Sequence, residues 1–123
     1  MTEAELFNKI ISPYFVKQGR FVYHIDYNRV PDVYTSFMVD KKHLMVWWYE
    51  LKVVRRPRKD GSIKPTYQPG QRSFAYDQKI LSGVDNISLI VYIESTKEAR
   101  LYIDLQKVYT KEDYYININK WKL

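Results

Sequence analysis

The chain has 123 residues, enough for one domain with a hydrophobic core and too few for two ordinary ones, so we expect a single domain over residues 1–123. Hydrophobic residues make up 46% of it and charged residues 28%, a composition that excludes an intrinsically disordered chain. It has no cysteine, which excludes disulfides and thiolate metal sites, and its net charge of +6 favours an anionic partner.

The N-terminal segment has the pattern of an amphipathic helix over residues 3–17. Its apolar residues recur every three or four positions: Leu6, Phe7, Ile10, Ile11, Tyr14 and Phe15. Thr2 is the expected N-cap, and Pro13 predicts a kink or an early end. The segment does not resemble a signal peptide, and no run of the chain reaches the roughly 18 apolar residues that span a bilayer. We therefore expect no membrane partner and an intracellular, cytoplasmic location.

Three strands are predicted next, at residues 21–26, 34–39 and 44–54, where β-branched and aromatic residues are enriched. The third is apolar on both faces, which is typical of a central strand. A loop follows over residues 55–68, because this stretch contains two prolines, Pro57 and Pro65, and an Asp-Gly pair.

The second half of the chain predicts a helix from Pro69 to about Leu81, ended by Ser82-Gly83. Two more strands are expected at residues 87–94 and 100–108, and the alternating tail 114–123 indicates a final strand, an arm or a dimer contact. The order of elements predicts an α/β fold in which a mixed β-sheet is flanked by helices.

The predicted loop contains the densest positive charge of the chain. Its segment RRPRKDGSIK has five bases and one acid, the bases being Arg55, Arg56, Arg58, Lys59 and Lys64. Such a loop favours the phosphate backbone of nucleic acid, and Arg72 just beyond it is a further candidate contact. Membrane surfaces and acidic proteins attract similar loops, and a merely solvated loop is the structural alternative.

The central predicted strand carries Glu50 and Lys52 inside the apolar run WWYELKVV. The pattern acid-x-Lys also occurs at Asp40–Lys42, in a predicted turn, and at Asp77–Lys79, in a predicted helix. Only in the strand does a spacing of two place both side chains on the same face. A buried charge is costly unless it is paired or binds a metal ion. A structural ion pair at a strand end is the alternative.

A second carboxylate is placed near Glu50 by the register of a hairpin. If Asp40–Lys42 forms a three-residue loop, Val39 pairs with His43, and the same register sets Asp32 opposite Glu50, with the two Cβ atoms roughly 5 Å apart. A two-residue loop would shift Asp32 by one position along the opposite strand. Asp32 also follows a proline, so that a turn cap is its structural alternative.

Two carboxylates at that separation repel each other unless a proton or a cation lies between them. The expected cation is a hard divalent ion, Mg²⁺ or Mn²⁺. Its oxygen ligands would be Asp32, Glu50 and a main-chain carbonyl near Leu51.

The segment Pro31-Asp32, followed after 17 residues by Glu50-Leu51-Lys52, resembles the signature of the PD-(D/E)XK nuclease superfamily. This superfamily includes many restriction endonucleases, archaeal-type Holliday junction resolvases and VRR-NUC nucleases. The segment Gln68-Pro69-Gly70-Gln71 before a helix and the strand at 87–93 are similar to the same family, in which a Gln at this place often supports the active site. The resemblance covers about residues 3–95 and implies a restriction-endonuclease-like core.

The resemblance also implies roles for individual residues. Asp32, Glu50 and the Leu51 carbonyl would ligate Mg²⁺, and Lys52 would position the attacking water and stabilise charge on the phosphate. Gln71 would hold Lys52 or the substrate. The family commonly adds an acid from the first helix. Glu5 is the first candidate for that acid and Glu3 the other.

The implied activity is that of a Mg²⁺-dependent endonuclease that hydrolyses phosphodiester bonds in DNA. The small size favours recognition of shape, as in branched DNA such as a Holliday junction, and symmetric cutting predicts a homodimer that uses the tail. Two alternatives stay open. One is a nuclease that acts on RNA, and the other is a non-catalytic nucleic-acid-binding or assembly module that uses loop 55–64.

Overall fold

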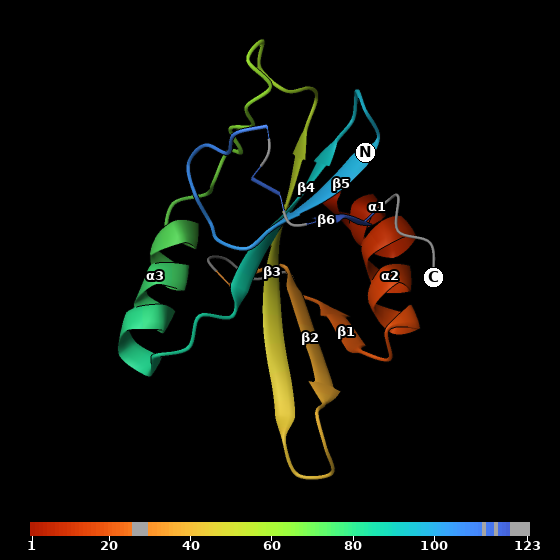
Figure 1. Ribbon diagram of the computed structural model, residues 1–123, viewed down its shortest axis with the longest axis vertical. Helices are drawn as coiled ribbons and strands as arrows, with labels where there is room; N and C mark the ends of the chain where they lie inside the picture. Colours follow the sequence, from red (N-terminus) through yellow and green to blue (C-terminus); the bar gives the residue numbers. More distant parts are fainter. Residues whose placement is uncertain (26–29, 112, 115, 119–123) are drawn as a thin grey trace.

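The computed structural model describes residues 1–25, 30–111, 113–114 and 116–118. The chain folds into a mixed β-sheet with helices on both faces (Figure 1). The strands are β1 (Phe21–His24), β2 (Val33–Met38), β3 (Leu44–Val54), β4 (Ile87–Ile93), β5 (Glu98–Tyr102) and β6 (Ile116–Asn117). They lie in the order of their numbers across one six-stranded sheet. The α/β class with a mixed sheet is therefore as expected. Within the described residues, no helix is long and apolar enough to cross a membrane.

The N-terminal helix is continuous over residues 3–17. Its parts are α1 (Glu3–Leu6), a π-helical turn η1 (Phe7–Ile11) and α2 (Ser12–Lys17). The Thr2 hydroxyl accepts the Glu5 N–H, which confirms the predicted cap. The early end predicted at Pro13 does not occur. The helix widens before the proline, with the Ser12 N–H bonded to the Phe7 carbonyl five residues back, and continues through Pro13 to Lys17.

Helix α3 (Gln71–Ser82) connects β3 to β4, which pair in parallel, whereas all other neighbouring strands pair antiparallel. The predicted start at Pro69 is wrong by two residues, because Gly70 adopts a left-handed φ of 90° directly before the helix. The predicted stop is confirmed: Gly83 ends the helix with a φ of 71°.

The β2–β3 hairpin has the predicted register. Its pairs run from Val33 opposite Tyr49 to Met38 opposite Leu44. The Val39 N–H donates to the His43 carbonyl at 2.9 Å, so that the loop consists of the three residues expected. One further step along this register brings Asp32 beside Glu50.

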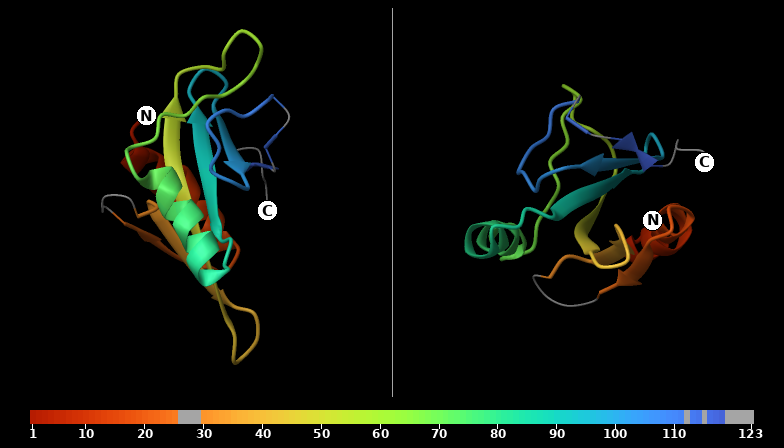
Figure 2. Two further views of the ribbon diagram at one scale, coloured as in Figure 1. Left: turned by 90° about the vertical axis from the view of Figure 1, so that its left-hand side faces the viewer. Right: turned by 60° about the horizontal axis from the view of Figure 1, so that its bottom comes forward.

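Two apolar clusters lie on opposite faces of the sheet, and Figure 2 shows α3 and the α1–α2 segment on opposite sides of it. The cluster under α1–α2 includes Leu6, Ile11, Phe15, Tyr49, Leu51 and Ile90. The cluster on the other face includes Ile63, Leu89, Val91, Ile93, Tyr102 and Tyr109. Because strand side chains alternate, Tyr49 and Leu51 enter the first cluster while Glu50 and Lys52 point to the other face.

The C-terminal part departs most from the predicted elements. The strand expected at 100–108 is β5, which ends at Tyr102. Beyond it the chain turns back, because the buried Tyr109 hydroxyl donates to the Asp104 carbonyl and accepts the Gln106 N–H. In the tail, β6 pairs with β5. Tyr115 and residues 119–123 of the predicted tail strand, and Asp26 of the first predicted strand, lie outside the described residues.

Candidate functional site

The charged pair of β3 is buried against the second cluster. Glu50 is 1% exposed and Lys52 is 7% exposed, and their neighbours on β4 are the apolar Leu89 and Val91. Their position follows from the sequence, since the apolar run holds β3 at the centre of the sheet. Two ionisable groups are thus held in an environment where charge needs partners.

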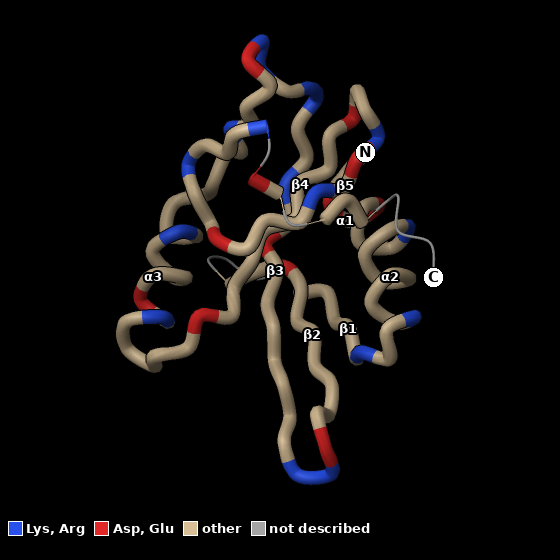
Figure 3. Tube along the Cα trace, in the orientation of Figure 1, with Lys and Arg blue, Asp and Glu red and all other residues tan. Residues whose placement is uncertain are grey.

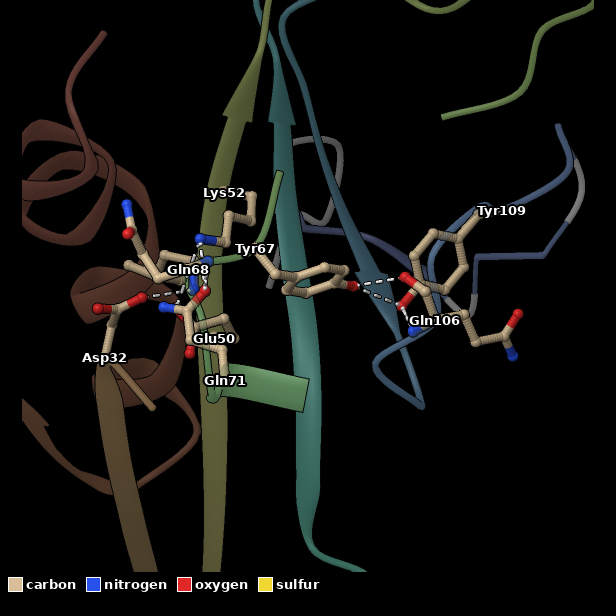
Figure 4. A network of polar contacts seen from close by, with 9 residues as sticks. Asp32, Glu50, Lys52, Tyr67, Gln68, Gln71, Gln106 and Tyr109 are labelled. Atoms are coloured by element: carbon tan, nitrogen blue, oxygen red, sulfur yellow. Dashed lines mark hydrogen bonds and ion pairs between the residues drawn. The ribbon is translucent and has the colours of Figure 1, made fainter. Parts of the chain in front are cut away.

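Gln71 provides those partners from the first turn of α3 (Figure 4). Its Nε2 donates to Glu50 Oε1 at 2.8 Å, and its Oε1 accepts from Lys52 Nζ at 2.9 Å. The Gln68 N–H donates to the same Oε1 at 2.7 Å, which fixes the end of the loop. Lys52 Nζ lies 4.0 Å from Glu50 Oε1. One amide therefore sets the distance between the acid and the base.

Asp32 reaches this group from the start of β2. Its Oδ2 accepts the Leu51 N–H at 2.9 Å. If β2 were longer, a main-chain carbonyl would accept this N–H instead. The N–H and C=O of one strand residue point to the same side, so the Leu51 carbonyl is also directed toward Asp32. Asp32, Glu50, Lys52, Gln71 and the Leu51 main chain thus come together, as the sequence suggested.

The pKa of Glu50 is strongly raised. Burial raises the pKa of Glu50 to about 10, and a hydrogen bond with Asp32 and the charge of that carboxylate add to the rise, while Lys52 acts against it. Without a cation, the pair therefore keeps one proton at neutral pH.

The first-helix acid near the site is Glu3, and the first choice, Glu5, lies elsewhere. Glu5 contacts Thr2 and Lys9, at 3.6 Å from the lysine ammonium. In contrast, partial desolvation and the charge of Asp32 raise the pKa of Glu3, while Lys52 lowers it. The sequence contains a signal for this choice, because Glu3 precedes the buried Leu6 by three residues and so shares its helix face.

Tyr67 is a neighbour of the site that the sequence did not indicate. Its ring centroid lies 5.7 Å from Lys52 Nζ and 6.0 Å from the Arg72 guanidinium carbon. Its hydroxyl donates to the Gln106 carbonyl at 2.6 Å and lies 3.3 Å from the Tyr109 hydroxyl (Figure 4). Burial raises the pKa of this hydroxyl. These contacts join segments about forty residues apart, so no local pattern reveals them.

The basic loop leaves the sheet directly after the strand of Glu50 and Lys52 (Figure 3). All six predicted nucleic-acid contacts have exposed side chains: Arg55, Arg56, Arg58, Lys59, Lys64 and Arg72. The loop is nevertheless anchored. The Gly61 N–H donates to the Arg58 carbonyl, and buried Ile63 forms a β-bridge with Tyr109. The exposed bases therefore extend from an anchored backbone that continues from the strand of Glu50 and Lys52.

The oxygen atoms of the site are the candidate ligands of a metal ion. Within the described part of the chain, no group of three or more His, Asp or Glu side chains is arranged to hold one. The direct oxygen donors are the carboxylates of Asp32 and Glu50 and the Leu51 carbonyl. Mg²⁺ is commonly held by one or two carboxylates, with water and substrate phosphate completing its shell, so this donor set fits such an ion.

Comparisons with known proteins do not assign the chain to a family. No family model matches the chain, and no curated protein matches it.

Proposed function

We propose that the protein is a divalent-metal-dependent endonuclease that hydrolyses phosphodiester bonds in DNA. The proposal rests on one observation: two carboxylates, a lysine and the Gln71 amide come together around the central strand β3, and an exposed basic loop leaves the sheet from the end of that strand. A site of two carboxylates, a lysine and a glutamine is what the resemblance of the sequence to the PD-(D/E)XK superfamily implies. The order of a helix, three antiparallel strands, a crossover helix and a parallel strand is compatible with a restriction-endonuclease-like core.

The carboxylates of Asp32 and Glu50 and the Leu51 carbonyl are the groups that would hold Mg²⁺ or Mn²⁺. Such an ion, when bound, neutralises phosphate charge and lowers the pKa of a water molecule. The raised pKa of Glu50 supports this assignment. Burial and the nearby Asp32 carboxylate disfavour a negative charge on Glu50, and a bound cation would replace the proton and stabilise that charge.

The remaining side chains act by position. Lys52 places an ammonium next to the carboxylates, where it stabilises negative charge that develops on a phosphate and orients the attacking water. Gln71 holds Lys52 and Glu50 at a fixed separation, which reduces the reorganisation needed when substrate binds. Glu3 adds negative charge at the edge of the same site.

The substrate contacts follow from the basic loop. Its bases neutralise backbone phosphates on either side of the cut, and such contacts carry no base sequence. Contacts of this kind respond to the shape of the backbone, and branched DNA is the substrate class we favour. A homodimer would present two such sites for cuts in two strands.

The test is cleavage of branched, double-stranded and single-stranded DNA, with RNA for comparison, in Mg²⁺, in Mn²⁺ and in EDTA. We expect cleavage that requires the metal and falls at least about a thousandfold in Asp32→Asn and Glu50→Gln. Binding to the same DNA, measured by fluorescence anisotropy in EDTA, should survive both substitutions.

Asp77→Asn is the matched control, since Asp77 belongs to an acid-x-Lys pair with an exposed side chain on α3. It should leave cleavage unchanged. The proposal fails if no metal gives cleavage, or if cleavage persists in both site variants. Retained DNA binding without cleavage in the wild type would instead support the second candidate, a non-catalytic binding module, which the exposed and anchored basic loop favours.

A further inference from the structure

A cavity of about 450 Å³ lies on the sheet face opposite Glu50, between α2 and the strands. Helix α2 ends at Lys17 and leaves part of β2 and β3 uncovered beside it (Figure 1). The apolar lining comes from Phe37, Met45, Trp47, Leu101, Ile103 and Ile116. Met45 is 43% exposed and Ile103 is 50% exposed, so the cavity is open to solvent at this rim. Its volume lies within the range of about 300–1,000 Å³ that is typical of small-molecule sites.

The polar groups at the bottom of the cavity bond to one another. Trp47 Nε1 donates to Ser88 Oγ at 2.8 Å, and the Ser88 hydroxyl donates to the Ile103 carbonyl at 2.8 Å. The indole and the hydroxyl are therefore satisfied without a ligand, and this part of the wall acts as an apolar surface.

Among the described residues that line the cavity, Arg20 is the one cation. Its guanidinium carbon lies 5.3 Å from the Phe15 ring centroid and 4.7 Å from that of Phe37, and its Nη1 donates to the Tyr49 hydroxyl at 3.2 Å. In the described part of the chain, no carboxylate pairs with it. A guanidinium has five N–H donors, so several stay available to an acceptor that enters the cavity. Held over two rings, it is oriented before any ligand arrives.

We propose that this cavity binds a small amphipathic acid, with its apolar body against Met45 and Trp47 and its carboxylate on Arg20. The fork of a guanidinium matches a carboxylate in two parallel hydrogen bonds. Among the described lining residues, Arg20 is the single charge beside a mostly apolar wall, which fits a monoanion better than a phosphate dianion. The site is independent of the proposed nuclease activity, because it lies on the other face of the sheet and shares no residue with that site.

The test compares 4-phenylbutyrate with 4-phenylbutan-1-ol, which has the same apolar body without the charge. Both are titrated into the ¹⁵N-labelled protein, and the backbone amide and Trp indole N–H signals are followed by NMR. We expect the acid to bind at least about tenfold more tightly than the alcohol, since a hydrogen bond to a charged group supplies a difference of this size. The largest shifts should lie at the Trp47 indole and the Ile103 amide.

Variants then assign the carboxylate contact. Arg20→Met should remove the preference for the acid, whereas Lys17→Met, which changes an exposed cation at the end of α2 outside the lining, should keep it. Ile103→Glu places a negative charge at the exposed rim and should weaken the acid alone, while Ile103→Gln is its neutral match. These rim variants decide the question even if Arg20→Met does not fold.

The proposal is overturned by any of three results. The first is that the alcohol binds as tightly as the acid. The second is that both Arg20→Met and Ile103→Glu leave the affinity for the acid unchanged. The third is that neither probe binds this face at about 10 mM.

Discussion

At the residue scale, Glu50 combines burial with a chemical task. Its carboxylate is 1% exposed and accepts one hydrogen bond from Gln71, and burial together with the neighbouring Asp32 raises its pKa to about 10. A protein without a use for this acid would be more stable with a neutral side chain of the same shape. Stability and its pH dependence therefore report on the site directly.

We expect Glu50→Gln to stabilise the metal-free protein by about 1–2 kcal/mol at pH 8, because the amide imitates the protonated acid. Below the ordinary Glu pKa of 4.5, folded and unfolded wild type both hold the proton, so the substitution should be nearly neutral. Above it, the unfolded state releases the proton while the folded state retains it. Wild-type stability therefore falls as pH rises toward the folded pKa of about 10, and the variant lacks this loss.

The measurement is urea unfolding in EDTA at pH 4, 6 and 8. Asp77→Asn serves as the exposed control. A stability difference that shrinks between pH 4 and pH 8 would contradict the raised pKa of Glu50.

Gln71 should act as a positioning residue. Gln71→Met keeps a similar volume but removes the partners of Glu50, Lys52 and the Gln68 N–H. We expect a loss of about 1–3 kcal/mol in the free energy of unfolding. The cleavage rate should fall about 10–100-fold, as is usual for groups that orient an active site.

The control is Gln78→Met on the same helix, where the amide bonds to Asn86 at 2.6 Å. It should lower stability and leave cleavage at saturating DNA unchanged. Equal losses of cleavage in both variants would show that α3 supports the site only through its stability.

At the element scale, the basic loop has a charge pattern that salt dependence can measure. We expect the triple variant Arg55→Ala, Arg56→Ala, Arg58→Ala to bind duplex DNA more weakly. The negative slope of log K against log[salt] should become shallower by about 2–3, since each lost phosphate contact removes about 0.9 from its magnitude. Fluorescence anisotropy over a range of salt concentrations gives the slope.

Lys41→Ala with Lys42→Ala is the control, because these lysines lie at the turn of the β2–β3 hairpin, at the end of the sheet away from the loop (Figure 3). If this pair lowers the slope as much as the loop variant, DNA lies along the hairpin and the assignment of loop 55–64 is wrong.

The sequence predicted those elements whose signals are local. β3 has its predicted bounds because an apolar run ends at charged residues, and the end of α3 follows from Gly83. The start of α3 was misplaced because Pro69 suits a first turn, while the left-handed conformation of Gly70 is visible only in the structure. β5 ends early because the Tyr109 hydroxyl bonds to the main chain at Asp104, a contact that strand propensity does not contain.

The candidate site was predictable to the extent that it depends on strand geometry. The alternation of β3 places Glu50 with Lys52, and the hairpin register places Asp32 beside them. The choice between Glu3 and Glu5 depends on how the first helix packs on the sheet, and Tyr67 depends on a second loop. Both are tertiary contacts that spacing alone does not specify.

At the scale of the whole molecule, one sheet separates two clusters that share its strands. Leu89 and Ile90 are consecutive in β4, and each is 0% exposed, yet they belong to different clusters. We expect Leu89→Ala and Ile90→Ala each to cost about 2–5 kcal/mol in the free energy of unfolding. Both should shift one common transition, because neither cluster retains its sheet when the other is lost.

Thermal unfolding followed by far-UV circular dichroism and by tryptophan fluorescence checks this. The two probes should give the same midpoint in each variant. Separate midpoints would show that the two faces unfold independently.

The three-residue turn of the β2–β3 hairpin has a consequence for how this protein tolerates change. The turn sets the register of the strand pairs from Met38–Leu44 to Val33–Tyr49. A change in this register changes which residue lies opposite Glu50 at the far end of the hairpin. Lys41 is exposed, and its side chain is free to vary. If a three-residue turn forms again after Lys41 is removed, one strand slides by a position and Asp32 lies against Leu51. A two-residue turn would instead keep Val39 opposite His43 and Asp32 opposite Glu50. A change in the length of this turn therefore alters the site whenever it changes the register, whereas a substitution of Lys41 leaves the register as it is.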